Sequence, residues 1–281
     1  MSFKVILKDK EEGKTSFSSL GDLKREYGTR TVGHAGTLDK FASGLMICLV
    51  GKATKLNSLF MGYGKEYVAK IKFGEETDTL DPEGEVIKRC PPPSEEALRA
   101  VLPSFLGEQK QRPPVYSAVH VDGKRAYKEA RKGEVVEMPE RLVTISSLEL
   151  LSFSGDEAVI RASVSKGTYI RSLSRDIAER AGSCGHTSAL RRLRIGPYTV
   201  QDTGLSTSEI LERTEAFSKA VFPEEQRKCL DNGLAPYERL LSDSSPERPY
   251  AYLYSGERLY GIAERKKDGF CHIIRLDDGE L

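Results

Sequence analysis

The sequence predicts an α+β fold built around a mixed β-sheet, and two patterns support this. Segments that alternate between polar and apolar residues, as half-buried strands do, recur along the 281-residue chain. Segments with helical spacing stand between them at irregular intervals, without the strict βαβ period of a parallel α/β fold. No internal repeat is present. The length suits one large domain, or one domain with a small appendage.

The first third of the chain contains one predicted helix, two predicted strands and a turn. Residues 18–28 form an apolar stripe at helical spacing, with Ser18 as the N-cap. The run GLMICLV (44–50) is short and entirely apolar, which indicates a buried strand. Residues 67–73 alternate between an apolar face and a face that carries lysines. The acidic segment 75–85 reads as a turn.

The middle of the chain is predicted to contain three helices. Ser94 caps the first, and an extended segment over 111–123 leads into a basic helix over 124–133. An alternating strand over 157–164 then passes through a glycine turn into a helix over 170–181.

The C-terminal part combines a helix, a linker and a small sheet. A capping box, Ser206 with Glu209, opens the helix. The Ser- and Pro-rich segment 240–249 resembles a linker, and 250–281 is predicted to form a three-stranded meander.

The composition is that of an ordinary globular protein, with 38% hydrophobic and 30% charged residues. The N-terminus has only a short apolar stretch before charges return, which argues against a secretory signal, and no apolar run approaches the roughly 18 residues of a membrane span. The five cysteines are odd in number and scattered. We therefore expect a cytoplasmic protein with reduced thiols.

The net charge of +1 conceals a segregated distribution. Residues 24–65 hold seven basic against two acidic residues, and 161–196 hold eight against two, whereas 75–96 hold eight acidic against two basic residues. If the basic segments meet in space, they form a positive face suited to a polyanion. Solvated helix faces are the alternative, and the sequence leaves both open.

One segment, GHAGTLDKFASGLMICLVGKATKL (33–56), places a single carboxylate, Asp39, between a Gly-, Thr- and His-containing loop and an apolar run. It resembles the catalytic motif of the bacterial TruB family of pseudouridine synthases. Further blocks match in family order across residues 9 to about 200: DKEEGKTS, KEYVAKIKFGEETDTLDPEGEV, RPPVYSAVHVDGKRAYKEARKG, SKGTYIRSLSRDIAERAG and ALRRLRIG. A lone GTLD would be weak evidence, but this ordered set is highly specific.

The resemblance implies the pseudouridine synthase fold: a central mixed, largely antiparallel sheet flanked by helices, with a small β-rich C-terminal segment. It also implies isomerisation of the T-loop uridine (position 55) of tRNA to pseudouridine. This reaction breaks the N1–C1′ bond, turns the uracil and rejoins it through C5. One carboxylate can start it, by covalent attack or by assisting glycal formation, so no second acid is needed. No cofactor or metal is expected, and no four-ligand spacing for zinc is present.

The resemblance also assigns the site residues. Asp39 is the catalytic acid, and Arg171 pairs with it, keeping it ionised in a site that would otherwise raise its pKa. Tyr67 stacks on the extruded uracil, and Tyr169 and Leu190 line its pocket. His34 contacts the RNA near the flipped nucleotide. Without the resemblance, core packing explains Tyr67, Tyr169 and Leu190 equally well, and a turn role would be favoured for Asp39.

Two departures from the family pattern stand near the site: Lys40 and Phe41 replace the usual Pro-Leu, and Glu11–Glu12 interrupt a DKPxG pattern after Lys10. The C-terminal segment is short for a PUA-type RNA-binding module. We therefore expect a catalytic domain over 1–235 and a reduced PUA-like segment over 236–281.

The expected partner is the T-arm stem-loop of tRNA, bound by a monomer without a membrane or an obligate protein partner. A guide-RNA-dependent synthase of the dyskerin type is one alternative, which the short tail argues against. A tRNA-binding folding chaperone is another.

Overall fold

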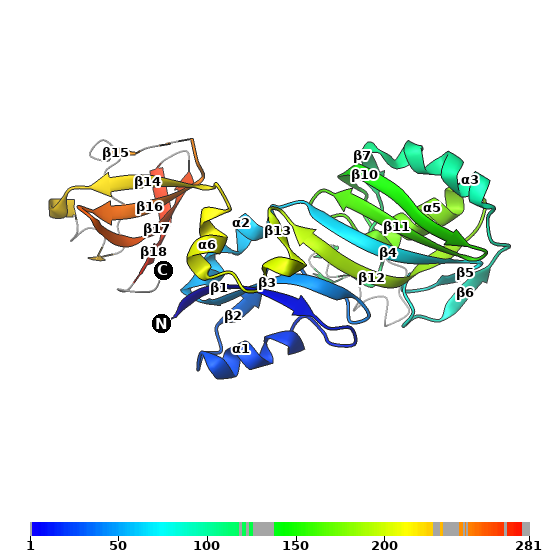
Figure 1. Cartoon of the computed structure of the whole chain (residues 1–281), viewed down its shortest axis with the longest axis horizontal. Coiled ribbons are helices and arrows are strands. Elements are labelled where there is room, and N and C mark those ends of the chain that lie inside the picture. The colour runs from blue at the N-terminus through cyan, green and yellow to red at the C-terminus, as the bar shows by residue number, and fades with distance from the viewer. Residues whose placement is uncertain are drawn as a thin grey trace.

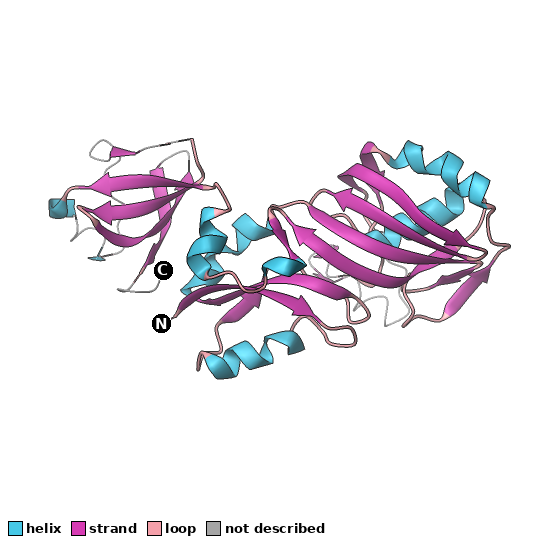
Figure 2. Ribbon diagram, in the orientation of Figure 1, coloured by secondary structure: helices cyan, strands magenta, loops and turns pink. Residues whose placement is uncertain are grey.

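A computed structural model describes residues 2–117, 120–121, 124–125, 138–226, 231–232, 242–243, 245, 247–266 and 269–276. The molecule is elongated: a large sheet carries α3 and α5 at one end, and a smaller sheet lies at the other (Figures 1 and 2). No helix in these ranges is both long enough and apolar enough to cross a membrane.

The helical segments are short, and strands dominate. The α-helices in the described ranges are α1 (Gly21–Glu26), α2 (Asn57–Met61), α3 (Glu95–Val101), α5 (Ile170–Arg180) and α6 (Thr207–Glu212). The 3-10 turns are η1 (Ser18–Leu20), η2 (Lys52–Leu56), η3 (Leu102–Phe105), η4 (Val200–Asp202) and η5 (Glu224–Gln226).

Within the described residues, the large sheet has nine strands and is mixed but largely antiparallel. Its main path runs β1 (Phe3–Lys10), β3 (Ser43–Gly51), β12 (Gly185–Ile195), β4 (Lys65–Phe73), β11 (Glu157–Val164), β10 (Arg141–Ser154) and β7 (Gly107–Gln111), with β2 (Val32–His34) on β3 and β13 (Tyr198–Thr199) on β12. The pair of β3 and β12 is parallel, and the other pairs are antiparallel. The predicted α+β class and mixed sheet are confirmed.

The central strands explain the two apolar patterns of the sequence. Alternate residues of β3 enter two different cores: Met46 and Cys48 join one, while Leu45, Ile47 and Leu49 join the other. Because both faces of β3 are covered, its run is apolar without alternation.

The neighbouring strand β4 has one buried face and one solvent-facing face. Its apolar face, which begins with Tyr67, enters the first core only. Lys70 and Lys72 stand on the opposite face and pair with Glu157 and Asp156 of β11 or the turn before it. The predicted alternation of 67–73 is confirmed.

The part of the smaller sheet that the structure describes has five strands in the order β15 (Ser242–Asp243), β14 (Phe217–Phe222), β16 (Tyr250–Ser255), β17 (Arg258–Lys266) and β18 (Gly269–Arg275). The last three strands form the predicted antiparallel meander. However, β14 pairs in parallel with β16, so this sheet begins at Phe217, well before the expected boundary at 235. The expected linker over 240–249 also contributes β15 to the sheet.

Two shorter hairpins complete the described strands. The hairpin of β5 (Glu75–Thr77) and β6 (Val86–Arg89) contains the acidic turn, and β8 (His120–Val121) pairs with β9 (Lys124–Arg125). Most of the expected basic helix over 124–133 lies outside the described residues.

The helix caps test the local predictions. Ser94 and Ser206 cap α3 and α6 as expected, and Glu209 completes the capping box. Ser18 does not cap its helix: it opens the 3-10 turn η1, and its N–H donates to Thr15 Oγ1 at 3.0 Å. A Thr–Ser turn therefore replaces the predicted cap.

Candidate active site

A short loop between β2 and β3 carries Asp39, and the segment after β1 fixes its backbone. Ser16 Oγ donates to the Leu38 carbonyl and accepts from the Leu38 N–H, both at 2.8 Å. The Gly13 N–H donates to the Lys40 carbonyl at 2.8 Å. Because residues on both sides of Asp39 are bound, the position of its carboxylate is restricted.

Two buried cations hold the same loop. Lys10 and Arg192 are each 1% exposed. Lys10 Nζ donates to the carbonyls of Glu11 (2.9 Å), Lys14 (2.6 Å) and Lys40 (3.4 Å). Arg192 Nη2 donates to the Gly36 carbonyl at 3.1 Å. The acidic residues that follow Lys10 therefore do not prevent it from holding the loop.

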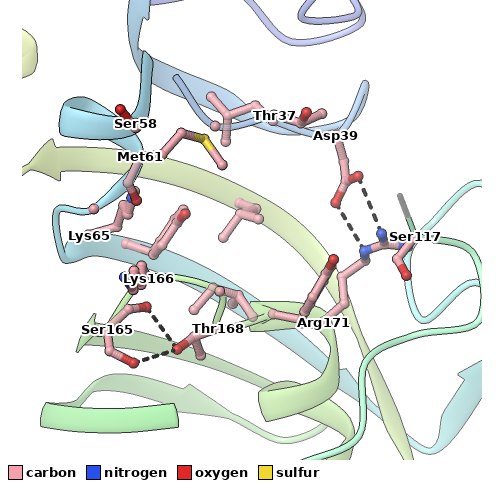
Figure 3. A pocket seen from close by; sticks show the side chains of 18 residues that line it. Thr37, Asp39, Ser58, Met61, Lys65, Ser117, Ser165, Lys166, Thr168 and Arg171 are labelled. Carbon is pink, nitrogen blue, oxygen red and sulfur yellow. Dashed lines mark hydrogen bonds and ion pairs between the residues drawn. The ribbon is translucent and has the colours of Figure 1, made fainter. Parts of the chain in front are cut away.

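Arg171, in the first turn of α5, contacts Asp39 with two nitrogen atoms (Figure 3). Its Nε lies 3.0 Å from Asp39 Oδ2, and its Nη2 donates to Oδ1 at 3.3 Å. Nη1 contacts Asp81 Oδ2 at 3.0 Å and the Thr79 carbonyl at 2.8 Å, while Nη2 also donates to the Tyr116 carbonyl at 3.0 Å. The two terminal nitrogens thus make four hydrogen bonds, and Nε adds an ion-pair contact, so the orientation of the side chain is restricted.

Asp81, in the turn between β5 and β6, is a second carboxylate that the sequence analysis missed. Its Oδ1 accepts from Thr79 Oγ1 at 2.6 Å and from the Glu83 N–H at 3.0 Å. Its side chain is 8% exposed, whereas that of Asp39 is 37% exposed. A substrate can therefore reach Asp39, while Asp81 is committed to holding Arg171. In the sequence, the only signal was that Asp81 lies in an acidic turn. Charge and turn propensity explain such a segment as well as a role in the site does.

The pKa of the Asp39 carboxyl is raised above its ordinary value. Burial is the main cause, Arg171 opposes it, and the negative charges of Asp81 and Glu83 add to it. The arginine therefore acts in the expected direction, but the surroundings outweigh it. A carboxylate with a raised pKa is also a more basic group than one exposed to water.

A pocket of about 600 Å³ lies beside this ion pair, a volume typical of small-ligand sites. Asp39, Arg171, Tyr67, Tyr169 and Leu190 all line it. Tyr67 and Leu190 come from the adjacent strands β4 and β12 and are each 8% exposed. Tyr169 precedes α5. The structure thus brings five of the six predicted site residues together.

The backbone of Tyr169 is fixed by one side chain. Its N–H donates to Gln111 Oε1 at 2.8 Å, and its carbonyl accepts from Gln111 Nε2 at 3.1 Å. Gln111, at the end of β7, therefore positions one wall of the pocket.

His34 is the predicted site residue outside the pocket lining. It ends β2, and burial together with the charge of Arg192 lowers its pKa, which favours the neutral imidazole. Its predicted contact with RNA stays a prediction.

The departure at Lys40 has a structural counterpart. Its Nζ lies 3.0 Å from Glu83 Oε1, which links the Asp39 loop to the turn that carries Asp81. Phe41 is 8% exposed and joins the core under the large sheet.

The basic segment 161–196 is largely used within the protein. Seven of its eight basic residues have protein partners: Arg161, Arg171, Arg175, Arg180, Arg191, Arg192 and Arg194. Lys166 is the exception among the described residues. Charge segregation in the sequence therefore does not translate directly into a positive surface.

No group of three or more possible metal ligands occurs in the described part of the chain.

Two family models match the chain. The TruB family pseudouridylate synthase (N terminal domain) covers residues 24–170, and the tRNA pseudouridylate synthase B C-terminal domain covers residues 171–242. The tRNA pseudouridine synthase B of Borreliella burgdorferi (strain ZS7) is 43% identical over 238 residues, which is 82% of this chain and 84% of that protein. The protein of the same name from Bordetella parapertussis is 45% identical over 200 residues, 70% of this chain and 82% of that protein.

Solved structures share the fold at lower identity. A chain in the crystal structure of a Cbf5-Nop10-Gar1 complex superposes with a TM-score of 0.64 and 23% identity, covering 100% of this chain and 85% of that chain. At this identity, the likeness shows a common fold.

Proposed function

Because this chain belongs to the TruB family of pseudouridylate synthases and is a tRNA pseudouridine synthase, we propose that its substrate is the T-loop uridine at position 55. The observation that carries the proposal is the exposed side of the Asp39 carboxylate, which lines a pocket of about 600 Å³ while Arg171 holds its other side. We propose that the enzyme acts as a monomer without a guide RNA.

Asp39 is proposed to start the reaction at the ribose–base unit. Either its carboxylate attacks covalently, or it assists loss of the base to leave a glycal. In both routes the N1–C1′ bond breaks, the uracil turns within the pocket, and the C5–C1′ bond forms. Any bond that Asp39 forms to the substrate is broken again before release, and in the glycal route the C2′ proton that leaves returns to C2′. The C5 proton is then lost and N1 gains one, so atoms balance without water or an oxidant.

Arg171 is proposed to orient Asp39 throughout these steps. Its four hydrogen bonds hold the guanidinium in place, so it does not need to reorganise when the carboxylate changes charge. Tyr67 is proposed to stack on the uracil, with Tyr169 and Leu190 as further walls. His34, at the end of β2, is proposed to contact the RNA outside the pocket.

A T-loop base is stacked inside folded RNA, so we propose that the enzyme flips it into the pocket. Unstacking costs a few kcal/mol, which contacts with the RNA backbone must offset. Hairpin shape, more than linear sequence, then selects the substrate. The described cysteines Cys48, Cys90 and Cys184 carry free thiols, consistent with a proposed cytoplasmic location.

The test incubates purified protein with unmodified tRNA transcripts, without guide RNA, and maps pseudouridine at nucleotide resolution. We expect product at position 55 from the wild type. Asp39→Asn should form none while binding tRNA within about threefold of the wild type, because the amide keeps the size but loses the nucleophile.

Three results would contradict parts of the proposal. Product at another position would overturn the assignment of the substrate uridine. A requirement for guide RNA would favour the dyskerin-type reading, and a folding effect on tRNA without any product would favour the chaperone. Substantial product from Asp39→Asn at long incubation would remove Asp39 from the catalytic role.

A further inference from the structure

The pocket beside Asp39 has two chemically different ends (Figure 3). Asp39 and Arg171 occupy one end. Lys65 and Lys166 lie at the other, together with Ser58. A flipped uracil that reacts at Asp39 accounts for the first end, but it does not account for two cations at the second.

Lys65, the first residue of β4, is a cation without a carboxylate partner among the described residues. Its Nζ donates to the carbonyls of Met61 at 3.1 Å and Tyr63 at 2.5 Å, which leaves one of three ammonium hydrogens unused. Burial, together with the nearby charges of Arg192 and Lys166, lowers its pKa to about 8. An ammonium held in this way is stabilised by a bound anion.

Lys166 lies in the turn that joins β11 to α5. The Thr168 N–H donates to the Ser165 carbonyl at 3.4 Å, and Gly167 has a φ of +81° within this turn. The side chain of Lys166 is exposed and has no ion pair or hydrogen bond within the described part of the chain. It is therefore free to bind a ligand, in contrast to the arginines of the same segment.

We propose that Lys65 and Lys166 form a phosphate subsite, which binds the RNA backbone phosphate adjacent to the flipped uridine. The inference rests on the proposed function, since it assumes that a nucleotide of the substrate enters this pocket. A nucleotide carries its negative charge on the phosphate and none on the uracil, so the phosphate is the group that the two ammonium groups match. Such contacts fix the register of the RNA and carry no sequence information.

The experiment measures binding of T-arm hairpins in an Asp39→Asn background, so that turnover does not interfere. One hairpin is native, and two others carry a single uncharged methylphosphonate, on the 5′ or the 3′ side of the target uridine. Lys166→Met should weaken binding of the native hairpin about five- to twentyfold. The slope of log K against log salt should fall by about 0.7, the value for one contact with single-stranded RNA.

The decisive comparison is between hairpins. With the methylphosphonate at the matching position, Lys166→Met should change affinity less than twofold, and the position that shows this identifies the phosphate. Lys65→Met should show the same coupling. Because each coupling compares two RNAs on the same protein, any loss of stability from the freed Met61 and Tyr63 carbonyls cancels.

Lys70→Met is the matched control, because Lys70 lies on the opposite face of β4 and pairs with Glu157 at 3.2 Å. It should change binding less than twofold on all three hairpins. Equal losses for Lys166→Met on the native and both modified hairpins would overturn the phosphate subsite and indicate a contact with the base or ribose. Failure of the proposed function is read separately, from the position of the product made by the wild type.

Discussion

Arg171 shares its single positive charge between two carboxylates, and this determines how the site responds to pH. The Asp39 carboxylate is reachable from solvent, whereas that of Asp81 is buried. When both acids are ionised, these two carboxylates and Arg171 together carry a charge of −1. Arg171 lowers the pKa of Asp39, while Asp81 raises it. Substitution of Arg171 or Asp81 should therefore shift the pKa of Asp39 in a defined direction.

Arg171→Ala should raise the pKa of Asp39 further, because the opposing charge is lost. If ionised Asp39 is the active form, activity is lost at low pH and recovers as the pH rises through the new pKa. The acid limb of the single-turnover rate should move to higher pH by about one unit or more. The double variant Arg171→Ala/Asp81→Asn should move it back toward lower pH, because the second negative charge is gone.

Thermal melting supplies the control for this prediction. Loss of one partner from a buried ion pair costs about 3–5 kcal/mol, and Asp81→Asn should restore part of it in the double variant. A rate defect that is the same at every pH would show that Arg171 acts by orientation alone. Near-wild-type activity of Arg171→Ala would remove the ion pair from the mechanism.

Two substitutions of Tyr67 distinguish a role in stacking on the base from a role in the chemical step. Base–aromatic stacking contributes about 1–3 kcal/mol and needs only the ring, so Tyr67→Phe should bind the T-arm hairpin nearly as well as the wild type. Tyr67→Leu should weaken binding, by roughly five- to a hundredfold. Equilibrium binding and single-turnover rates distinguish the two effects.

The Phe variant also tests the hydroxyl group. Normal binding with no product would give the hydroxyl a chemical role, such as removal of the C5 proton. Full activity in both variants would place Tyr67 in the core and outside the site.

The residues of the site were predictable to different degrees. Asp39, Arg171, Tyr67, Tyr169 and Leu190 stand in recognisable blocks, and the structure places all five around one pocket. Asp81 was missed because its role is defined by a partner 90 residues away in the sequence. Local pattern reveals that a segment is an acidic turn, but the contact that it makes is a property of the tertiary structure.

The same distinction holds for whole elements. Strands with one buried face were predicted from alternation, and caps at Ser94 and Ser206 from local chemistry. The cap predicted at Ser18 failed because the Ser18 N–H and hydroxyl both donate to Thr15, three residues earlier. The parallel pairing of β14 with β16 was not predictable, because it joins strands separated by about 30 residues without a periodic signal.

Gly44 marks the point where β3 and β12 run in parallel, and it connects the sheet to the catalytic loop. Its φ is +110°, and a Cβ atom there would overlap the backbone carbonyl of Arg192, its partner in the register. Gly44→Ala should therefore destabilise the protein by more than about 2 kcal/mol, since backbone strain and overlap add. The rate of pseudouridine formation should also fall, because Arg192 holds the Gly36 carbonyl.

Gly155→Ala is the matched control for this element. Gly155 also has a positive φ, of +63°, but no atom lies within 4 Å of the position of its Cβ. It should cost about 1–2 kcal/mol from the backbone alone and leave the rate unchanged. Equal losses of stability in chemical denaturation would show that the junction of β3 and β12 tolerates the overlap.

At the scale of the whole molecule, the two sheets share one hydrophobic core. Phe3 and Leu45 of the large sheet cluster with Tyr250, Ile262 and Ile274 of the small one. Phe217, in β14, joins the same cluster. A division at residue 235 would split the small sheet between β14 and its partner β16, so we propose that the C-terminal unit begins near residue 216.

This arrangement predicts the outcome of a truncation after Ser245. The cut removes β16, β17 and β18, and with them Tyr250, Ile262, Ile274 and Leu276 of the shared core. At about 1.5–3 kcal/mol for each buried apolar side chain, the loss is roughly 6–12 kcal/mol. The remaining chain should melt at least about 10 °C lower, or fail to fold cooperatively, because 1 kcal/mol corresponds to roughly 2–4 °C at this size. Differential scanning calorimetry and limited proteolysis measure this directly.

The reference for the truncation is the full-length variant Ile262→Ala, which removes one core side chain and should cost about 2–5 kcal/mol. A truncated protein with an unchanged melting temperature and full activity on the T-arm hairpin would show that the large sheet folds independently of the small one.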